Sequence, residues 1–344
     1  MRYLFKIFLP LLLVVAGIAV YYGYIQFEQF KTSPINQDIE SYEIKNGSNI
    51  RSIAKDLENR GLIKSAAYFT ILSKIEKLDT KIKAGEYHLK ADLTPADLLL
   101  LFSKGKTVQY KLRIPEGSRY SDIVQIIKND KHLKHTLSDN DFKNIMTLLD
   151  TKYSHHQPEG WFFPDTYHFA KGMTDKQFLQ RAHNTMQQVL DKLWKQQPKH
   201  VKGIKTPYDA LILASIVEKE TGHPKDRRKV ARVFINRLAK NMLLQTDPTV
   251  IYGMGQAYNG NIRKKDLKKD TPYNTYMRKG LTPTPIATPG LASIEAVFNP
   301  EAGDMLYFVA KGDGTSYFSK NYTQHKKAVI KYLLNGKASR YKGD

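Results

Sequence analysis

The sequence predicts an α+β protein with one membrane-spanning helix at its N-terminus, a small strand–helix–helix–strand subdomain and a larger mixed domain of helices and strands. Three observations support this prediction. Residues 4–24 are apolar or aromatic apart from Lys6, a strand–glycine–helix pattern occurs twice in the first half of the chain, and helical segments alternate with proline-rich loops in the second half.

The composition is that of a folded protein with an anionic partner. The 344 residues suffice for two or three domains, and 41% hydrophobic with 25% charged residues is typical of globular proteins. Lys and Arg exceed Asp and Glu by 54 to 33, so the net charge is +21 and favours nucleic acid, an anionic membrane face or an acidic polymer. The absence of cysteine excludes disulfides, thiolate metal sites and a cysteine nucleophile.

The apolar run at residues 4–24 predicts a membrane anchor, because as a helix it would span about 31 Å, the thickness of the hydrocarbon core of a bilayer. Arg2 and Lys6 stand at its start and no basic cluster follows it, so the positive-inside rule places residues 1–3 in the cytoplasm and the body outside. A signal peptide cleaved near residues 16–19 is the alternative. Either way the body is exported, which argues against nucleic acid and favours the acidic cell wall as the partner.

A polar linker is expected at residues 25–40, and a short pattern occurs twice after it. The first copy is Ile44-Lys45-Asn46-Gly47-Ser48-Asn49-Ile50 and the second is Ile114-Pro115-Glu116-Gly117-Ser118-Arg119-Tyr120. Each predicts a strand, a glycine turn, a serine helix cap and an amphipathic helix. With a second helix at 66–77 and a returning strand at 85–90, residues 41–107 form a βααβ subdomain, and residues 108–340 form the larger domain.

The opening of this subdomain, Tyr42-x-Ile44-x-x-Gly47-Ser48-x-Ile50-x-x-Ile53-Ala54, resembles a LysM module. The resemblance implies a small LysM-like fold that binds the glycan of the cell wall. The alternative is a structural βα unit without carbohydrate contact, since glycine and serine before an amphipathic helix are common.

The middle of the chain carries an aromatic segment, Glu159-Gly160-Trp161-Phe162-Phe163-Pro164-Asp165-Thr166-Tyr167. So many aromatic residues predict either a loop that anchors the core or the wall of a groove on which sugar rings stack. Helices are expected within residues 138–149, from a serine or aspartate cap, and over 176–194, from the spacing of the apolar residues.

The strongest catalytic candidate lies at the end of a buried helix. A threonine cap, a proline and an aspartate at residues 206–209 form a helix start, and residues 211–217 are almost entirely apolar, so the helix is expected to be buried on all sides. Glu218 follows directly. A carboxyl group in apolar surroundings resists ionisation, and such a group suits general-acid cleavage of a glycosidic bond. The alternative is a surface glutamate paired with Lys219 or with a nearby arginine.

A second amphipathic helix is expected over residues 227–241. Rigid polar loops are expected over 243–252, 271–276 and 280–290, because their prolines fix the turns. Amides and hydroxyls on such loops suit hydrogen bonds to sugars, although ordinary turns use the same residue types.

These motifs together resemble the endolytic murein transglycosylase family (MltG, YceG-like). The resemblance covers residues 42–334, and its motifs come in the order of the family. They are the segment 159–167, Ala214-Ser215-Ile216-Val217-Glu218-Lys219-Glu220-Thr221, Val233-Phe234-Ile235-Asn236-Arg237-Leu238, Leu244-Gln245-Thr246-Asp247-Pro248-Thr249-Val250-x-Tyr252 and Pro272-Tyr273-Asn274-Thr275-Tyr276.

The resemblance implies a single-pass inner-membrane enzyme with a cytoplasmic N-terminus and a periplasmic body. Such an enzyme cleaves the MurNAc-GlcNAc β-1,4 bond within nascent peptidoglycan strands, leaves 1,6-anhydro-MurNAc ends and limits strand length. The catalytic glutamate of the family corresponds to Glu218, and wall synthases such as penicillin-binding proteins are implied as partners. Ser316 stands where the family usually has histidine, which puts substrate binding at that position in doubt. No metal or cofactor is expected.

In lytic transglycosylation the 6-hydroxyl of MurNAc attacks its own C1, so one carboxyl group acts first as acid and then as base. A muramidase-type hydrolase would need a second carboxylate, for which Asp247 and Glu159 are candidates. A non-catalytic wall-binding scaffold is the alternative outside the enzymes. Five polar residues on the loops are expected to position the glycan or orient Glu218: Gln245, Asp247, Tyr273, Asn274 and Thr275.

Overall fold

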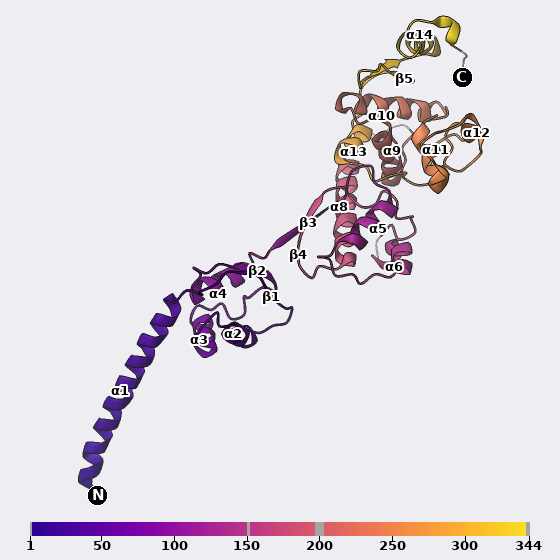
Figure 1. Cartoon of the computed structure of the whole chain (residues 1–344). Helices are drawn as coiled ribbons and strands as arrows, with labels where there is room; N and C mark the ends of the chain where they lie inside the picture. Colours follow the sequence, from indigo (N-terminus) through magenta and orange to yellow (C-terminus); the bar gives the residue numbers. More distant parts are fainter. Residues whose placement is uncertain (1, 150–151, 197–202, 342–344) are drawn as a thin grey trace. The chain divides into compact units, whose positions relative to one another are not determined.

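The computed structural model describes residues 2–149, 152–196 and 203–341, so the expected tail at residues 1–3 is described only in part. The chain forms two compact units (Figure 1). The first unit comprises Met1–Tyr110 and His168–Gly172, and the second comprises Lys111–Tyr167 and Met173–Asp344.

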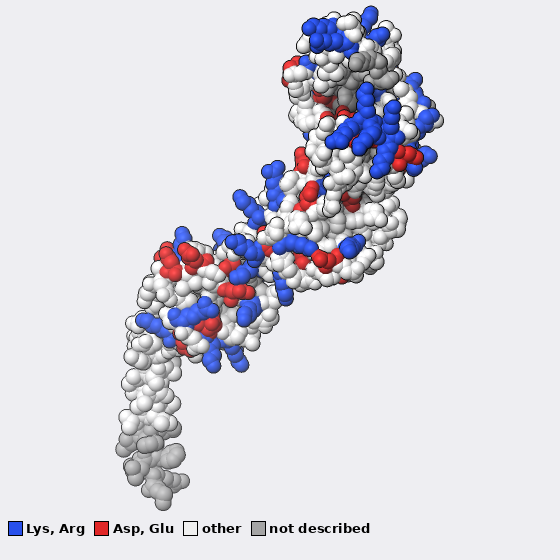
Figure 2. Space-filling model, turned by 45° about the vertical axis from the view of Figure 1, so that its right-hand side comes forward, with Lys and Arg blue, Asp and Glu red and all other residues white. Residues whose placement is uncertain are grey.

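Basic side chains occur on both units, on the face shown in Figure 2. A dense run of them lies at α12 (Lys264–Lys268), which Arg263 precedes and Lys269 follows. The net charge of +21 is therefore distributed widely, and it attracts anionic surfaces through long-range electrostatics.

The first helix, α1 (Arg2–Thr32), is longer than predicted. Its portion Leu11–Thr32 is long and apolar enough to cross a membrane, and its large side chains as far as Tyr24 are exposed. We expected a linker over 25–40, but the helix continues through the first part of that range. The reason is packing, since the rings of Phe27 and Phe30 each lie 5.7 Å from the ring of Tyr68.

Phe30 belongs to the core of the first unit, where it is 4% exposed. Because Phe30→Ala leaves a cavity, we expect it to lower the free energy of unfolding of this unit by about 3 kcal/mol, measured by urea unfolding of the full chain in detergent. Tyr22→Ala is the control, since Tyr22 on the same helix is 63% exposed. Equal losses in the two variants would contradict the packing of α1 on this unit.

The first unit has the predicted order of elements. β1 (Ile39–Ile44) is followed by α2 (Ile50–Asn59), α3 (Ala66–Ile75) and β2 (Gly85–Leu89), and the two strands pair antiparallel with Tyr42 opposite Tyr87. Both tyrosines are buried in the core. The predicted cap of α2 is wrong by one residue, because the side chain of Asn49, not Ser48, accepts the N–H of Ser52.

A further helix of the first unit, α4 (Pro95–Lys104), was not predicted from the sequence. Thr94 and Asp97 form a reciprocal capping box at its start, and Gly105 ends it with a φ of 67°. Leu98, Leu99 and Phe102 on its inner face are fully buried, so α4 completes the core that the βααβ elements begin.

β3 (Gln109–Arg113) pairs with β4 (Thr166–Ala170) and leads into α5 (Tyr120–Asn129). The helix expected within residues 138–149 is divided into α6 (Asp139–Lys143) and α7 (Ile145–Leu148).

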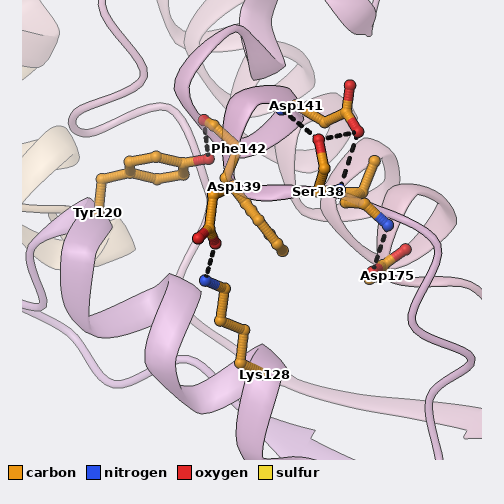
Figure 3. Close-up of polar contacts among 8 residues, drawn as sticks. Tyr120, Lys128, Ser138, Asp139, Asp141, Phe142 and Asp175 are labelled. Carbon is orange, nitrogen blue, oxygen red and sulfur yellow. Dashed lines mark hydrogen bonds and ion pairs between the residues drawn. The ribbon is translucent and has the colours of Figure 1, made fainter.

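Polar contacts fix α5 against α6 (Figure 3). Ser138 and Asp141 cap α6 reciprocally, and Lys128 of α5 forms an ion pair with Asp139. The hydroxyl of Tyr120 donates to the carbonyl oxygen of Phe142 at 2.7 Å. The start of α5 is therefore held in place, and Tyr120 presents its backbone N–H to the site described below.

The core of the second unit surrounds α9 (Pro207–Glu220), which packs against four other helices. They are α8 (Asp175–Gln196), α10 (Pro224–Ala239), α11 (Asp247–Met254) and α13 (Leu291–Phe298). Every residue of α9 from Ala210 to Val217 is buried, so the predicted buried helix is confirmed. The predicted capping box of Thr206 and Asp209 is present, with Pro207 at the first helical position.

The loop expected over residues 243–252 is partly helical, because α11 begins at Asp247 with Pro248 in its first turn. A 3₁₀ turn, η1 (Gly255–Ala257), ends it. At the C-terminus β5 (Tyr307–Ala310) and β6 (Ser316–Ser319) form an antiparallel hairpin, against which α14 (Tyr322–Tyr332) packs, and η2 (Ala338–Arg340) follows. Ser316 lies in β6, where its backbone N–H donates to Asp226 at 2.6 Å.

Candidate active site

Glu218 lies in the last turn of α9, directly after the buried run that ends at Val217. Its side chain is half-buried, and its Oε2 accepts the backbone N–H of Gly290 at 3.0 Å. Within the described residues this is the one hydrogen bond of the carboxyl group, so Oε1 stays available to a ligand. The rigid helix and the fixed N–H together hold one oxygen and leave the other open.

Two loops that are far apart in the sequence meet beside Glu218. Gly117 N–H donates to Thr288 O at 2.8 Å, and Thr288 N–H donates to Ser118 O at 2.8 Å. The ammonium of Lys219 donates to Gly117 O at 3.2 Å. The second copy of the repeated glycine turn is therefore fastened to the proline-rich loop at 280–290 and to the end of α9.

Gly290 is tightly enclosed in this arrangement, because a Cβ there would lie 2.0 Å from Glu116 Oε1 and 2.4 Å from Glu116 Cδ. The carboxylate of Glu116 thus lies against the same residue that donates to Glu218. We did not predict Glu116 from the sequence, where it was only one member of the repeated pattern. The signal that could have found it is the difference between the copies, because Asn46 occupies its place in the first.

Glu159 is a buried carboxyl group of the second unit, with 7% of its surface exposed. From the sequence it was only a candidate for the second carboxylate of a hydrolase. Its oxygens accept the N–H of Tyr120 at 2.9 Å and the hydroxyl of Tyr252 at 3.0 Å. Burial raises the pKa of Glu159 to about 7, although both hydrogen bonds and the nearby Arg119 favour the ionised form. Both oxygens are used internally, so Glu159 links α5 to α11 rather than facing open solvent.

Gly160 brings this segment into contact with the proline-rich loop. Its φ is +81°, and a Cβ there would lie 2.5 Å from the Cβ of the buried Pro285. Since the left-handed backbone and the clash with a rigid ring act together, we expect Gly160→Ala to lower the free energy of unfolding by about 3 kcal/mol in urea denaturation. Gly312→Ala is the matched control, because Gly312 has a φ of +90° but nothing within 4 Å. Similar losses in both would mean that the contact with Pro285 is not tight.

The aromatic residues after Gly160 serve the core. Trp161 and Phe162 are fully buried, and the ring of Trp161 stacks 5.7 Å from that of Tyr208 on α9. The interpretation of this segment as a core-anchoring loop is therefore confirmed for these two residues, and they do not form an open sugar-stacking wall.

The five loop residues predicted to position the glycan divide into two groups. Gln245 and Asp247 are exposed, and Tyr273 is half-buried with its hydroxyl 3.0 Å from that of Thr284. Asn274 and Thr275 are buried, at 1% and 3% exposure. The first three residues have surface that a ligand can reach, whereas the last two do not.

The buried pair holds the loops together. The amide of Asn274 donates to the carbonyl oxygens of Asp266, Leu267 and Lys269, which lie at the end of α12. Thr275 Oγ1 accepts the N–H of Thr246 at 3.1 Å. We therefore assign loop support to this pair.

A polar network that the sequence did not predict lies behind these loops. Glu220, two residues after Glu218, accepts the hydroxyl of Thr246, and burial raises the pKa of Glu220. Arg237 of α10, 8% exposed, donates to the carbonyl oxygens of Leu243 and Leu244 and to the side chain of Gln245. The end of α9, α10 and the start of α11 are thus joined by hydrogen bonds.

Comparison with known proteins identifies related chains. The sequence pattern of the YceG-like family matches residues 42–331. The endolytic murein transglycosylase of Bacillus subtilis strain 168 is 33% identical over 318 residues, which cover 87% of each chain. The endolytic murein transglycosylase of Streptococcus pneumoniae strain D39 is 30% identical over 96% of this chain, but the matched region is 64% of the pneumococcal protein.

A solved structure agrees with these matches. The crystal structure of a yceG-like protein from Listeria monocytogenes superposes with a TM-score of 0.50 at 34% sequence identity. The superposition covers 85% of this chain and 99% of the Listeria chain.

Proposed function

The chain belongs to the YceG-like family and is a murein transglycosylase, and on that basis we propose that it cleaves MurNAc-GlcNAc β-1,4 bonds within nascent glycan strands and leaves 1,6-anhydro-MurNAc ends. Cleavage inside the strands limits their length. Glu218 is the acid and then the base of this reaction.

The placement of Glu218 supports the proposal. The carboxyl group projects from the end of a buried helix, between two fastened loops, and one oxygen is held by the N–H of Gly290. Oε1 then carries the proton in the acid form and gives it to the glycosidic oxygen as the C1–O bond breaks. The carboxylate afterwards takes the proton of the 6-hydroxyl as that oxygen attacks C1. Glu218 ends protonated as it began, and no water is consumed.

The rival hydrolytic reaction needs a second carboxylate that activates water. Of the two candidates named from the sequence, Glu159 suits that role poorly, because both of its oxygens accept internal hydrogen bonds. Asp247 is exposed and accepts the hydroxyl of Tyr276 at 2.6 Å. Lytic transglycosylation needs neither group.

The experiment that tests the function uses the full chain in detergent with purified glycan strands. We expect a rapid fall in mean strand length, because internal bonds are cut, and new ends with the mass of anhydro-MurNAc. Release of only short fragments from strand ends would refute endolytic action. Binding of strands without cleavage, by the unaltered chain and by Glu218→Gln alike, would favour the non-catalytic scaffold.

The N-terminal helix supports a location in the inner membrane, with residues 1–3 cytoplasmic and the body periplasmic. We expect the full-length chain to stay in the membrane fraction after alkaline washing, and external protease to degrade the body in spheroplasts. A mature N-terminus near Val20, found by sequencing, would show a cleaved signal peptide instead.

The first unit and the positive charge are proposed to hold the enzyme at the wall. A βααβ order with paired outer strands is compatible with the LysM resemblance, and a charge of +21 favours acidic wall polymers and anionic lipid. We expect binding to insoluble peptidoglycan that weakens as salt rises. Crosslinking in cells would test partnership with penicillin-binding proteins or other wall synthases.

A further inference from the structure

The carboxylates of Glu116 and Glu218 both lie next to Gly290. Glu116 Oε1 lies 2.0 Å from the place of a Cβ on Gly290, and Glu218 Oε2 lies 3.0 Å from the nitrogen of Gly290. Standard bond lengths then place the two carboxylates no more than about 8 Å apart. Carboxylate pairs that flank a scissile glycosidic bond have separations of about 5–9.5 Å. Glu116 is therefore close enough to face the same sugar as Glu218.

The fold does not use the charge of Glu116. Its side chain is exposed, and in the part of the chain that the structure describes it has neither a hydrogen bond nor an ion pair. Gly290 is the N-cap of α13, and the N-terminal end of a helix favours a negative charge. A carboxylate held in this way is available to a ligand.

The turn that carries Glu116 is held firmly, although among the described residues Glu116 adds neither a hydrogen bond nor an ion pair to it. The contacts of Gly117 with Thr288 and Lys219 hold it, as described above. The first copy of the pattern provides an internal comparison, because Gly47 has a φ of 81°, close to the 72° of Gly117, with Asn46 in the place of Glu116. The turn therefore forms without a carboxylate, and the glutamate of the second copy needs another explanation.

We propose that Glu116 is the second carboxylate of this site, and that its negative charge faces the sugar ring bound beside Glu218. This inference rests on the proposed function. When Glu218 gives its proton to the glycosidic oxygen and the C1–O bond breaks, positive charge develops on C1 and the ring oxygen. Glu116 stabilises that charge while it stays ionised, and it transfers no proton. The 6-hydroxyl oxygen then bonds to C1, and its proton goes to Glu218.

The test compares variants of the full chain on glycan strands. We expect Glu116→Gln to lower kcat about 10²-fold with little change in KM, because the lost charge matters mainly in the transition state. The remaining product keeps its anhydro ends. Glu116→Asp should retain intermediate activity. Added formate should partly restore Glu116→Ala, since a small carboxylate can occupy the vacated space, whereas a merely structural residue would not be rescued in this way.

The matched control is Glu295→Gln, which removes an exposed carboxylate from α13 itself and should leave the rate unchanged. Activity of Glu116→Gln within twofold of the unaltered chain, or an equal loss in Glu295→Gln, would overturn the inference and leave the proposed function standing. An unaltered chain that cuts no strands would overturn the proposed function, and this inference with it.

Discussion

Glu218→Gln is expected to reduce cleavage of glycan strands by about 10²–10⁴-fold, the usual contribution of a general acid and base. Glutamine keeps the shape of the side chain and can still accept the N–H of Gly290, but it has no proton to give to the glycosidic oxygen. Because the same group also takes the proton of the 6-hydroxyl, both steps fail together. The measurement is the rate at which new strand ends appear, followed by mass spectrometry.

Glu218→Gln should lose activity because the proton transfer fails, and not because the protein is less stable. Glu218 is half-buried and has one hydrogen bond to the described residues, so its replacement by glutamine should change the free energy of unfolding by less than about 1 kcal/mol. Unchanged binding of strands by the variant would confirm that the site is intact. A cleavage rate within twofold of the unaltered chain would remove Glu218 from the mechanism.

Glu159→Gln is expected to stabilise the second unit at neutral pH by about 3 kcal/mol. Burial raises the pKa of Glu159 from 4.5 to about 7 in the folded chain. Between these two values the folded state holds a proton that the unfolded state has released. The stability that Glu159 contributes is therefore full below pH 4.5 and falls as pH rises to about 7. Glutamine can accept the N–H of Tyr120 with its carbonyl oxygen and donate an amide N–H to the hydroxyl oxygen of Tyr252, without the cost of a buried charge.

The measurement is urea unfolding of both chains at several pH values between 4.5 and 8. The difference between them isolates Glu159, because all other groups titrate in both chains. We expect the variant to gain on the unaltered chain as pH rises and the difference to level off above pH 7. A difference that stays constant across this range would contradict the raised pKa. Tyr252→Phe, which removes one hydrogen bond to the carboxylate, should enlarge the pH-dependent loss.

The helix that carries Glu218 could be predicted from its local sequence alone. Its cap, its proline and its apolar run are all encoded within residues 206–217, and no distant contact is needed to predict that the following glutamate projects from a buried helix. The repeated glycine turn and the βααβ order were predictable for the same reason.

Features that depend on distant contacts were missed. The extension of α1 past Tyr24 depends on Tyr68, and the importance of Glu116 depends on Gly290, which is remote in the sequence. Asn274 and Thr275 were expected to position the glycan or orient Glu218, and their burial was not predictable, because sequence cannot tell an amide that faces a ligand from one that binds backbone carbonyls. The type of a side chain determines which groups it can bind, but only the tertiary fold determines which groups it contacts.

The most direct test of lytic transglycosylation through Glu218 asks whether an oxygen atom from water enters the product. Glycan strands are cut by the full chain in water labelled with heavy oxygen, and the new ends are weighed. Lytic transglycosylation through Glu218 predicts anhydro-MurNAc ends without label, absent with Glu218→Gln. Reducing ends that carry the label would contradict the mechanism and show that a second carboxylate, for which Glu116 is a candidate, activates water.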